Sequence, residues 1–284
     1  MIELNQVSYT GRDENKPLLH RISFNIQEGQ WVSIIGKNGC GKSTLVKLLN
    51  RLLPSSGGSI IIDGMELTPL TVGSIREQVG MVFPNPDNQF VGLTVMDDMV
   101  FGLENRCLDL KLMQERVAHY ADKLQITHLL DRHPSQLSGG QKQRAALAAV
   151  LAMEPRIVIF DEATSMLDEK SKHDMIQMMQ DMKKSGQYTL ISVTHDHDEI
   201  TASDRVLALV DGAIGADCKP QDIWTQDRLL EACGLKPSFL VQLGRELQHR
   251  GIEISPHLQE KEVIDALWEL SLRTSAIRIT IPEA

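Results

Sequence analysis

Short apolar runs with the spacing of β-strands fill roughly the first seventy residues, and more follow later in the chain. Ile22, Phe24 and Ile26 alternate with polar neighbours, as in a half-buried strand. Compact apolar runs predict further strands: Trp31–Ile35, Ser59–Asp63, Val79–Phe83, Arg156–Phe160, Tyr188–Val193 and Arg205–Val210. From about Asp87 to Leu151, polar and apolar residues mix at helical spacing. Strands that alternate with helices predict an α/β fold with a parallel sheet and crossover helices.

The last quarter of the chain has a different, helical character. A helix is predicted from Phe239 to Arg250, because Pro237-Ser238 offers an N-cap and Gly251 ends the pattern. The apolar stripe of this helix is Leu240, Leu243 and Leu247. A second helix, from about Glu260, carries an apolar face made of Val263, Ile264, Leu267 and Trp268. We therefore expect a main domain over residues 1–215 and a C-terminal helical module over residues 216–284.

The composition favours a packed globular protein and argues against a nucleic-acid-binding protein. Of 284 residues, 42% are hydrophobic and 24% are charged, which is ordinary for a packed globular protein. The net charge of −9 gives no support for binding to a phosphate backbone, so no nucleic-acid partner is expected. The long stripe of methionines, Met175, Met178, Met179 and Met182, has the spacing of a core-facing or interface helix.

The cysteine pattern and the N-terminal sequence indicate in which cellular compartment the protein is expected. The four cysteines are scattered, without the spacing of a zinc site or a disulfide framework, so a reducing compartment fits: Cys40, Cys107, Cys218 and Cys233. The N-terminus lacks the pattern of a secretory signal, and no apolar run is long enough to span a bilayer. We expect a cytoplasmic protein that meets a membrane only through a partner.

A phosphate-binding motif follows the predicted strand Trp31–Ile35. Gly36-Lys37-Asn38-Gly39-Cys40-Gly41-Lys42-Ser43-Thr44 matches G-x-x-x-x-G-K-[ST] between a strand and a helix. The glycines let backbone N–H groups converge on phosphate oxygens, and the helix N-terminus adds its positive dipole end. Lys42 is expected to bridge the β- and γ-phosphates, and Ser43 to ligate Mg²⁺. The candidate nucleotide-binding residues are Gly36, Asn38, Gly39, Cys40, Gly41, Lys42, Ser43 and Thr44.

Two alternatives stay open for this loop. A chance glycine-rich turn is the plain alternative to the whole motif, although the flanking strand and helix count against it. A small residue that fills the loop is the favoured role for Cys40, with a catalytic thiol as the weaker one.

Two acids stand at the end of an apolar strand. Ile157-Val158-Ile159-Phe160-Asp161-Glu162 delivers two adjacent carboxylates, and neighbouring residues of a strand point to opposite faces. Asp161 is suited to hold Mg²⁺ through water, and Glu162 to polarise the attacking water as a general base. Two solvated acids at a strand end are the alternative, which the preceding phosphate loop weakens.

His195 follows the run Leu190–Thr194 and is expected near Asp161 in a parallel sheet. There it would contact a γ-phosphate and hold the arrangement of Glu162 and water. A lone histidine is more often a surface residue, but its position after a core strand favours function. His197 and Asp198 suggest a metal site only weakly.

Leu137-Ser138-Gly139-Gly140-Gln141 precedes an alanine-rich helix, and with the motifs above it resembles the signature of the ABC ATPase family. The resemblance covers Ile2 to about Gly212 and implies a P-loop NTPase ABC ATPase fold with an antiparallel β subdomain, an inserted helical subdomain at about 87–151 and a C-terminal helical module. It also implies that ATP lies between two subunits, so a monomer should be nearly inactive. The residues that would act on the nucleotide of the opposite subunit are Ser138, Gly139, Gly140, Gln141 and, at the D-loop, Asp168.

A narrower resemblance is to the ATPase of energy-coupling factor (ECF) importers of vitamins and metal ions. It rests on Asn85–Phe90, Phe101–Asn105 and Asp161–Asp168. It implies a peripheral ATPase at the cytoplasmic face of the membrane, with a C-terminal extension that joins two ATPases. The implied partners are a second ATPase, identical or paralogous, a transmembrane T component and a substrate-binding S component.

Two positions depart from the family pattern. Pro84 replaces the glutamine that reaches toward Mg²⁺ and the attacking water, and proline lacks both an amide side chain and an N–H. We expect lower hydrolysis or coupling with nucleotide binding kept; the alternative is that an extended loop tolerates proline. The aromatic residue that stacks on adenine would fall near Gly11, so Tyr9 is either an adenine contact or strand packing.

Two other functions remain as alternatives. A DNA-associated ABC ATPase would normally carry long coiled coils, and the segment between Lys42 and Ser138 shows no sustained heptads. A regulatory cassette that binds ATP with little turnover fits Pro84 but not the presence of both Glu162 and His195.

Overall fold

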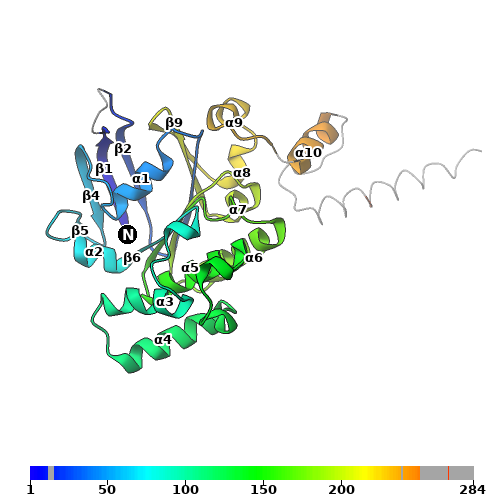
Figure 1. Ribbon diagram of the computed structural model, residues 1–284. Coiled ribbons are helices and arrows are strands. Elements are labelled where there is room, and N and C mark those ends of the chain that lie inside the picture. Colours follow the sequence, from blue (N-terminus) through cyan, green and yellow to red (C-terminus); the bar gives the residue numbers. More distant parts are fainter. Residues whose placement is uncertain (12–15, 238, 250–267, 269–284) are drawn as a thin grey trace, which may run out of the picture.

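Two β-sheets form the body of the protein (Figure 1). The computed structural model describes residues 1–11, 16–237, 239–249 and 268. The antiparallel sheet has the order β2-β1-β4-β5, from Leu19–Ile26, Ile2–Tyr9, Gly57–Ile62 and Met65–Glu66. The larger sheet has the order β10-β9-β3-β8-β7-β6, from Ala213–Cys218, Arg205–Val210, Trp31–Ile35, Thr189–Val193, Ile157–Asp161 and Val79–Val82. Its strands are parallel, except that β10 runs antiparallel to β9.

The predicted strands of the parallel sheet are confirmed, with ends that differ by no more than one residue. Strands β3, β7 and β8 are buried at every residue, because helices or the other sheet cover both faces. This explains why their sequences are continuous apolar runs and not alternating patterns.

Different elements cover the two faces of the parallel sheet. Helix α1 (Lys42–Leu49) packs with the antiparallel sheet in one core cluster, whose members include Ile2, Leu45, Ile159 and Val193. Helix α6 (Glu169–Lys184) packs with α5 (Gly139–Ala152) in the other core cluster. The methionine stripe of α6 is confirmed as core-facing, since Met175, Met179 and Met182 are buried.

Helices α3 (Val95–Glu104) and α4 (Leu110–Lys123) pack against α5 at one end of the sheet (Figure 1). Arginines of this region donate to the C-terminal carbonyls around α5: Arg116 Nη1 reaches Ala152 O at 3.3 Å, and Arg106 bonds Met153 O. The helical pattern predicted for 87–151 therefore corresponds to these three helices, and α5 is the part that meets the parallel sheet through β6.

The sheet continues beyond residue 215. The predicted domain boundary lies inside β10, and the division into two units stays a prediction. Helices α8 (Pro220–Ile223) and α9 (Asp227–Cys233) follow β10 and form a third core cluster with β9. Helix α7 (His197–Ala202), between β8 and β9, adds Ile200 to this cluster. The remaining helices are α2 (Val72–Gln78) and α10 (Phe239–His249).

Helix α10 agrees with the helix predicted from Phe239, and Leu243 and Leu247 are half-buried in it. The Leu240 side chain and the second predicted helix from Glu260 lie outside the described residues, except for Trp268, which is exposed. Among the residues that the structure describes, no helix has both the length and the apolar character to cross a bilayer.

Candidate functional site

The phosphate loop joins the end of β3 to the start of α1. Gly36, Gly39 and Gly41 have φ values of 153°, 81° and 107°, a region that side-chain-bearing residues rarely adopt. A Cβ at Gly36 would lie 2.3 Å from Leu209 O, so glycine is required there. Gly41 caps α1 without a side-chain hydrogen bond, which leaves the first N–H groups of the helix free for phosphate oxygens.

Lys42 is buried inside this loop. Its Nζ donates to Gly36 O at 2.7 Å and to Lys37 O at 3.2 Å. The same Nζ lies 3.9 Å from Glu162 Oε1. A buried ammonium that bonds carbonyl oxygens of its own loop is placed to exchange them for phosphate oxygens.

Ser43 and Asp161 meet from α1 and β7. Ser43 Oγ donates to Asp161 Oδ1 at 2.8 Å. Burial raises the pKa of Asp161, and the Ser43 hydrogen bond partly opposes this. In the described part of the chain, no cluster of three or more His, Cys, Asp or Glu side chains has the geometry of a metal site. Two oxygens nevertheless fit Mg²⁺, which keeps several waters and takes its other ligands from nucleotide phosphates.

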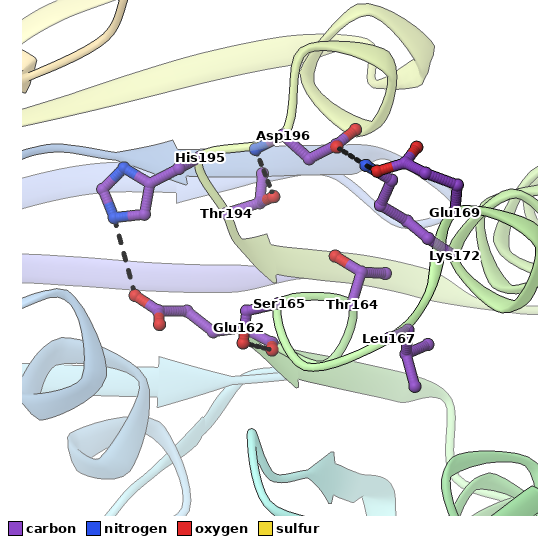
Figure 2. A pocket seen from close by; sticks show the side chains of 9 residues that line it. All are labelled: Glu162, Thr164, Ser165, Leu167, Glu169, Lys172, Thr194, His195 and Asp196. Carbon is purple, nitrogen blue, oxygen red and sulfur yellow. Dashed lines mark hydrogen bonds and ion pairs between the residues drawn. The ribbon is translucent and has the colours of Figure 1, made fainter. Parts of the chain in front are cut away.

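Glu162 and His195 face each other from the ends of the adjacent strands β7 and β8 (Figure 2). His195 Nε2 lies 3.6 Å from Glu162 Oε1, and Glu162 N donates to Val193 O at 2.9 Å. Burial first, and then the Lys42 charge, lower the pKa of His195, while Glu162 acts in the opposite direction. At neutral pH the imidazole is therefore neutral, with one nitrogen able to donate and the other to accept.

Both side chains line a cleft of about 290 Å³. Sequence reasoning missed several polar residues around it: Thr164, Thr194, Asp196, Glu169 and Lys172. The sequence offered one clue to the two threonines: Thr164 lies two residues after Glu162, and Thr194 lies directly before His195.

The signature residues form the start of α5. Ser138 Oγ accepts from Gln141 N at 3.3 Å, and Gln141 Oε1 accepts from Ser138 N at 2.9 Å, a reciprocal cap. A Cβ at Gly140 would come 2.4 Å from Ser171 Oγ on α6. Asp168 caps α6 and accepts from both Ser171 N (3.0 Å) and Ser171 Oγ (2.9 Å). These donors lower the pKa of Asp168.

The site residues thus fall into two groups. The phosphate loop, Asp161, Glu162 and His195 are joined by the contacts above. Ser138 to Gln141 and Asp168 form a second group, and no hydrogen bond or ion pair among the described residues joins it to the phosphate loop.

The structure shows the neighbours of Tyr9 and of Pro84, the two positions that depart from the family pattern. Tyr9 pairs with Leu19 in the antiparallel sheet and packs against the core cluster, which agrees with strand packing. Pro84 follows Phe83, whose N–H donates to Gln89 Oε1 at 3.2 Å and whose carbonyl accepts from Gln143 Nε2 at 3.2 Å. Gln89 therefore holds the backbone before Pro84, and its side-chain NH₂ bonds Ala146 O.

Comparison with known proteins agrees with this geometry. The family model described as ABC transporter matches residues 19–165. The chain is 45% identical over 272 residues to the energy-coupling factor transporter ATP-binding protein EcfA1 of Streptococcus sanguinis, covering 95% of this chain and 98% of that protein. It is 43% identical over 271 residues to EcfA1 of Streptococcus thermophilus, with the same coverage.

Solved structures show the same fold. One is cbiO1 from Clostridium perfringens, part of the ABC transporter complex cbiONQ, with a TM-score of 0.74 and 30% identity over 88% of this chain and 96% of that one. Another is a dimeric ATP-binding cassette in a post-hydrolysis state bound to ADP and Pi, with a TM-score of 0.70 and 27% identity over 78% of this chain and 99% of that one. The fold, the nucleotide loop and these relatives lead to one conclusion: the chain belongs to the ABC transporter ATPases and is an ATP-hydrolysing A component of the energy-coupling factor type.

Proposed function

We propose that this ATPase hydrolyses ATP at the interface between two subunits and thereby drives uptake of a vitamin or metal ion through membrane partners. The observation that supports this most directly is the convergence of Lys42, Ser43–Asp161, Glu162 and His195 at the carboxyl ends of β3, β7 and β8. This edge of an open parallel sheet is the usual place for ligands in such folds.

Each residue has a chemical role that its position allows. Lys42 exchanges its loop carbonyls for β- and γ-phosphate oxygens, and Ser43 and Asp161 are placed to hold Mg²⁺, which neutralises phosphate charge when bound. Glu162 accepts the proton of the attacking water. The neutral imidazole of His195 holds Glu162 on one side and reaches the γ-phosphate on the other.

The second group of residues supports hydrolysis between subunits. Ser138 and Gly139 are exposed at the start of α5, where unpaired N–H groups and the helix dipole favour a phosphate. Met166 of the segment before Asp168 is 66% exposed, as expected for a surface that a second ATPase covers. The second ATPase is an identical or paralogous chain, and Asp168 lies beside it.

Transport requires membrane partners, and we assign a transmembrane T component and a substrate-binding S component. The segment after Pro84 exposes three large apolar side chains, Val91, Leu93 and Phe101, which suit contact with a membrane subunit. The protein would then sit peripherally at the cytoplasmic face of the membrane.

Purification of the tagged chain from membranes, followed by reconstitution of the complex into vesicles, tests this proposal. We expect T and S components to copurify and uptake to require ATP. Lys42→Ala should keep these partners but lose hydrolysis and uptake, while Lys111→Ala, at an exposed lysine of α4, should retain both. A Lys42→Ala complex that still transports, or a chain that brings down no membrane subunit, would refute the proposal.

A further inference from the structure

A buried carboxylate lies behind the catalytic cleft. Glu199 is in the first turn of α7 and is 1% exposed. Its Oε2 accepts from Thr164 Oγ1 at 2.8 Å and from Thr194 Oγ1 at 3.0 Å. One oxygen of Glu199 therefore joins two chain segments that leave neighbouring strands.

These two threonines are close in sequence to the residues that do the chemistry. Thr164 is two residues after Glu162, and Thr194 comes directly before His195. Figure 2 shows Thr164 and Thr194 between the β7 end and the β8 end, on the side away from the Glu162–His195 contact. Both threonines are buried, so their hydroxyl groups are largely shielded from bulk water.

The hydrogen bonds of Thr194 have a defined direction when Glu199 is ionised. Thr194 Oγ1 accepts from Asp196 N at 3.0 Å, so its own proton is directed to Glu199. Asp196 Oδ1 accepts from Glu199 N, and Asp196 Oδ2 pairs with Lys172 Nζ at 3.0 Å. Asp196 thereby links the start of α7 to Lys172 of α6. This link fixes the backbone of Glu199, whose carboxylate bonds both threonines.

Among the residues that the structure describes, no lysine, arginine or histidine forms an ion pair with Glu199. Lys172 of the neighbouring helix α6 pairs with Asp196 and Glu169. Burial raises the pKa of Glu199 to about 7, and the threonine hydrogen bonds act in the opposite direction. A buried carboxylate without a cation costs stability, and an apolar side chain of similar size would not. Such groups concentrate at functional sites.

We propose that Glu199 is a positioning residue for ATP hydrolysis, which sets the separation of Glu162 and His195 by linking Thr164 to Thr194. This inference rests on the roles proposed above for Glu162 and His195. Without the link, the two segments are free to separate, and the water that Glu162 polarises loses its alignment.

The test compares Glu199→Leu, Glu199→Gln and the control Glu115→Leu, on the exposed face of α4, in the assembled transporter complex. For Glu199→Leu we expect kcat to fall about tenfold or more and the KM for ATP to change less than about twofold. Glu199→Gln keeps an oxygen that accepts from both threonines and should restore most of the rate. A merely structural role would leave kcat per folded protein unchanged, which would overturn the proposal.

The isosteric variant Thr164→Val removes the same link from the other side and leaves the hydrogen bond between Thr194 and Asp196 in place. It should lower kcat as Glu199→Leu does, and adding Glu199→Leu to it should cause no further loss. If Glu199→Leu does not fold, the threonine variant alone tests the positioning role of Glu199. Loss of turnover in Glu162→Gln alongside wild-type kcat in the threonine variant would overturn only the role of Glu199, whereas full turnover in Glu162→Gln would overturn the proposed mechanism itself.

Discussion

Glu162, the proposed general base, has an unusual backbone conformation. Its φ is 50°, the left-handed region that residues with a Cβ seldom adopt. This conformation turns the chain off β7, lets Glu162 N bond Val193 O, and points the carboxylate at His195. Backbone conformations of this kind persist where the surrounding structure enforces them, often at active sites.

Replacing Glu162 by glutamine should separate binding from hydrolysis. The amide keeps the shape but cannot take a proton from water, so we expect the ATPase rate to fall by about a hundredfold or more while ATP affinity is retained. Steady-state turnover and nucleotide binding measure the two effects, with Glu231→Gln, exposed on α9, as the control. More than half of the normal rate in Glu162→Gln would contradict a general-base role.

Glu199 should also give the stability of the protein a characteristic pH dependence. Its pKa is about 7 in the folded protein and 4.5 as the ordinary value. The folded state therefore holds a proton that the unfolded chain releases, so the contribution to stability is full below pH 4.5 and is lost as pH rises through about 7. The loss amounts to about 3 kcal/mol, because each pKa unit corresponds to about 1.4 kcal/mol.

Urea unfolding at several pH values measures this effect. The Glu199→Gln protein cannot titrate at this position, so its stability relative to the wild type should increase between about pH 5 and pH 8. The control Glu115→Gln should follow the wild type throughout. Curves for Glu199→Gln and wild type that stay parallel would show that Glu199 does not titrate in this range.

At the scale of elements, helix α5 connects the site with the helical region. Its N-terminus is the Ser138 cap, and its last carbonyls accept from Arg116 and Arg106. Arg116 also pairs with Glu154 at 2.5 Å and is 18% exposed at its side chain.

Removing Arg116 should weaken the whole fold without changing the site. Arg116→Ala leaves the Ala152 carbonyl without its charged donor, so we expect a loss of about 2 kcal/mol in unfolding free energy. ATP affinity should stay the same, since no nucleotide-binding residue contacts Arg116. Chemical denaturation tests the first point and nucleotide titration the second, with the exposed Arg132→Ala for comparison. Unchanged stability would show that solvent replaces these hydrogen bonds fully.

The loop after β6 offers a test of Pro84. Two glutamines hold the backbone of Phe83, and proline follows with no amide of its own. In Pro84→Gln, a side chain able to reach the attacking water is restored, so ATPase and uptake rates should rise about threefold or more at unchanged ATP affinity. Asn88→Gln, at an exposed residue of the same loop, serves as the control. Equal rates for Pro84→Gln and the wild type would favour a loop that simply tolerates proline.

Sequence patterns predicted the central strands and the motif residues because each signal is local. A run such as Ile157–Phe160 is apolar at every position, and Lys42 or Glu162 is defined by immediate neighbours. Glu199 carried no such signal, because the polar stretch from His195 onward gives no clue to which carboxylate α7 turns inward. The strand β10 was missed for a related reason, since its half-buried edge lacks a continuous apolar run.

At the scale of the whole molecule, the proposed mechanism needs both groups of site residues at one nucleotide, and within the described chain no hydrogen bond or ion pair joins them. The phosphate loop has free N–H groups on one side, and Ser138 is exposed at a second helix start. A second ATPase subunit that brings its Ser138 to the phosphate loop would complete both sites at once, as expected for a symmetric pair.

Trapping the ATP-bound state tests this assembly. Glu162→Gln should hold ATP unhydrolysed, so with ATP and Mg²⁺ it should elute from a sizing column at twice the mass found with ADP. Adding Ser138→Arg places a long cationic side chain at the helix start facing the opposite nucleotide and should prevent the dimer while leaving single-chain ATP binding nearly intact. Adding Ser135→Arg, at an exposed residue just before the signature, controls for charge alone. A dimer that survives Ser138→Arg would argue against a signature that packs directly against the nucleotide of the opposite subunit.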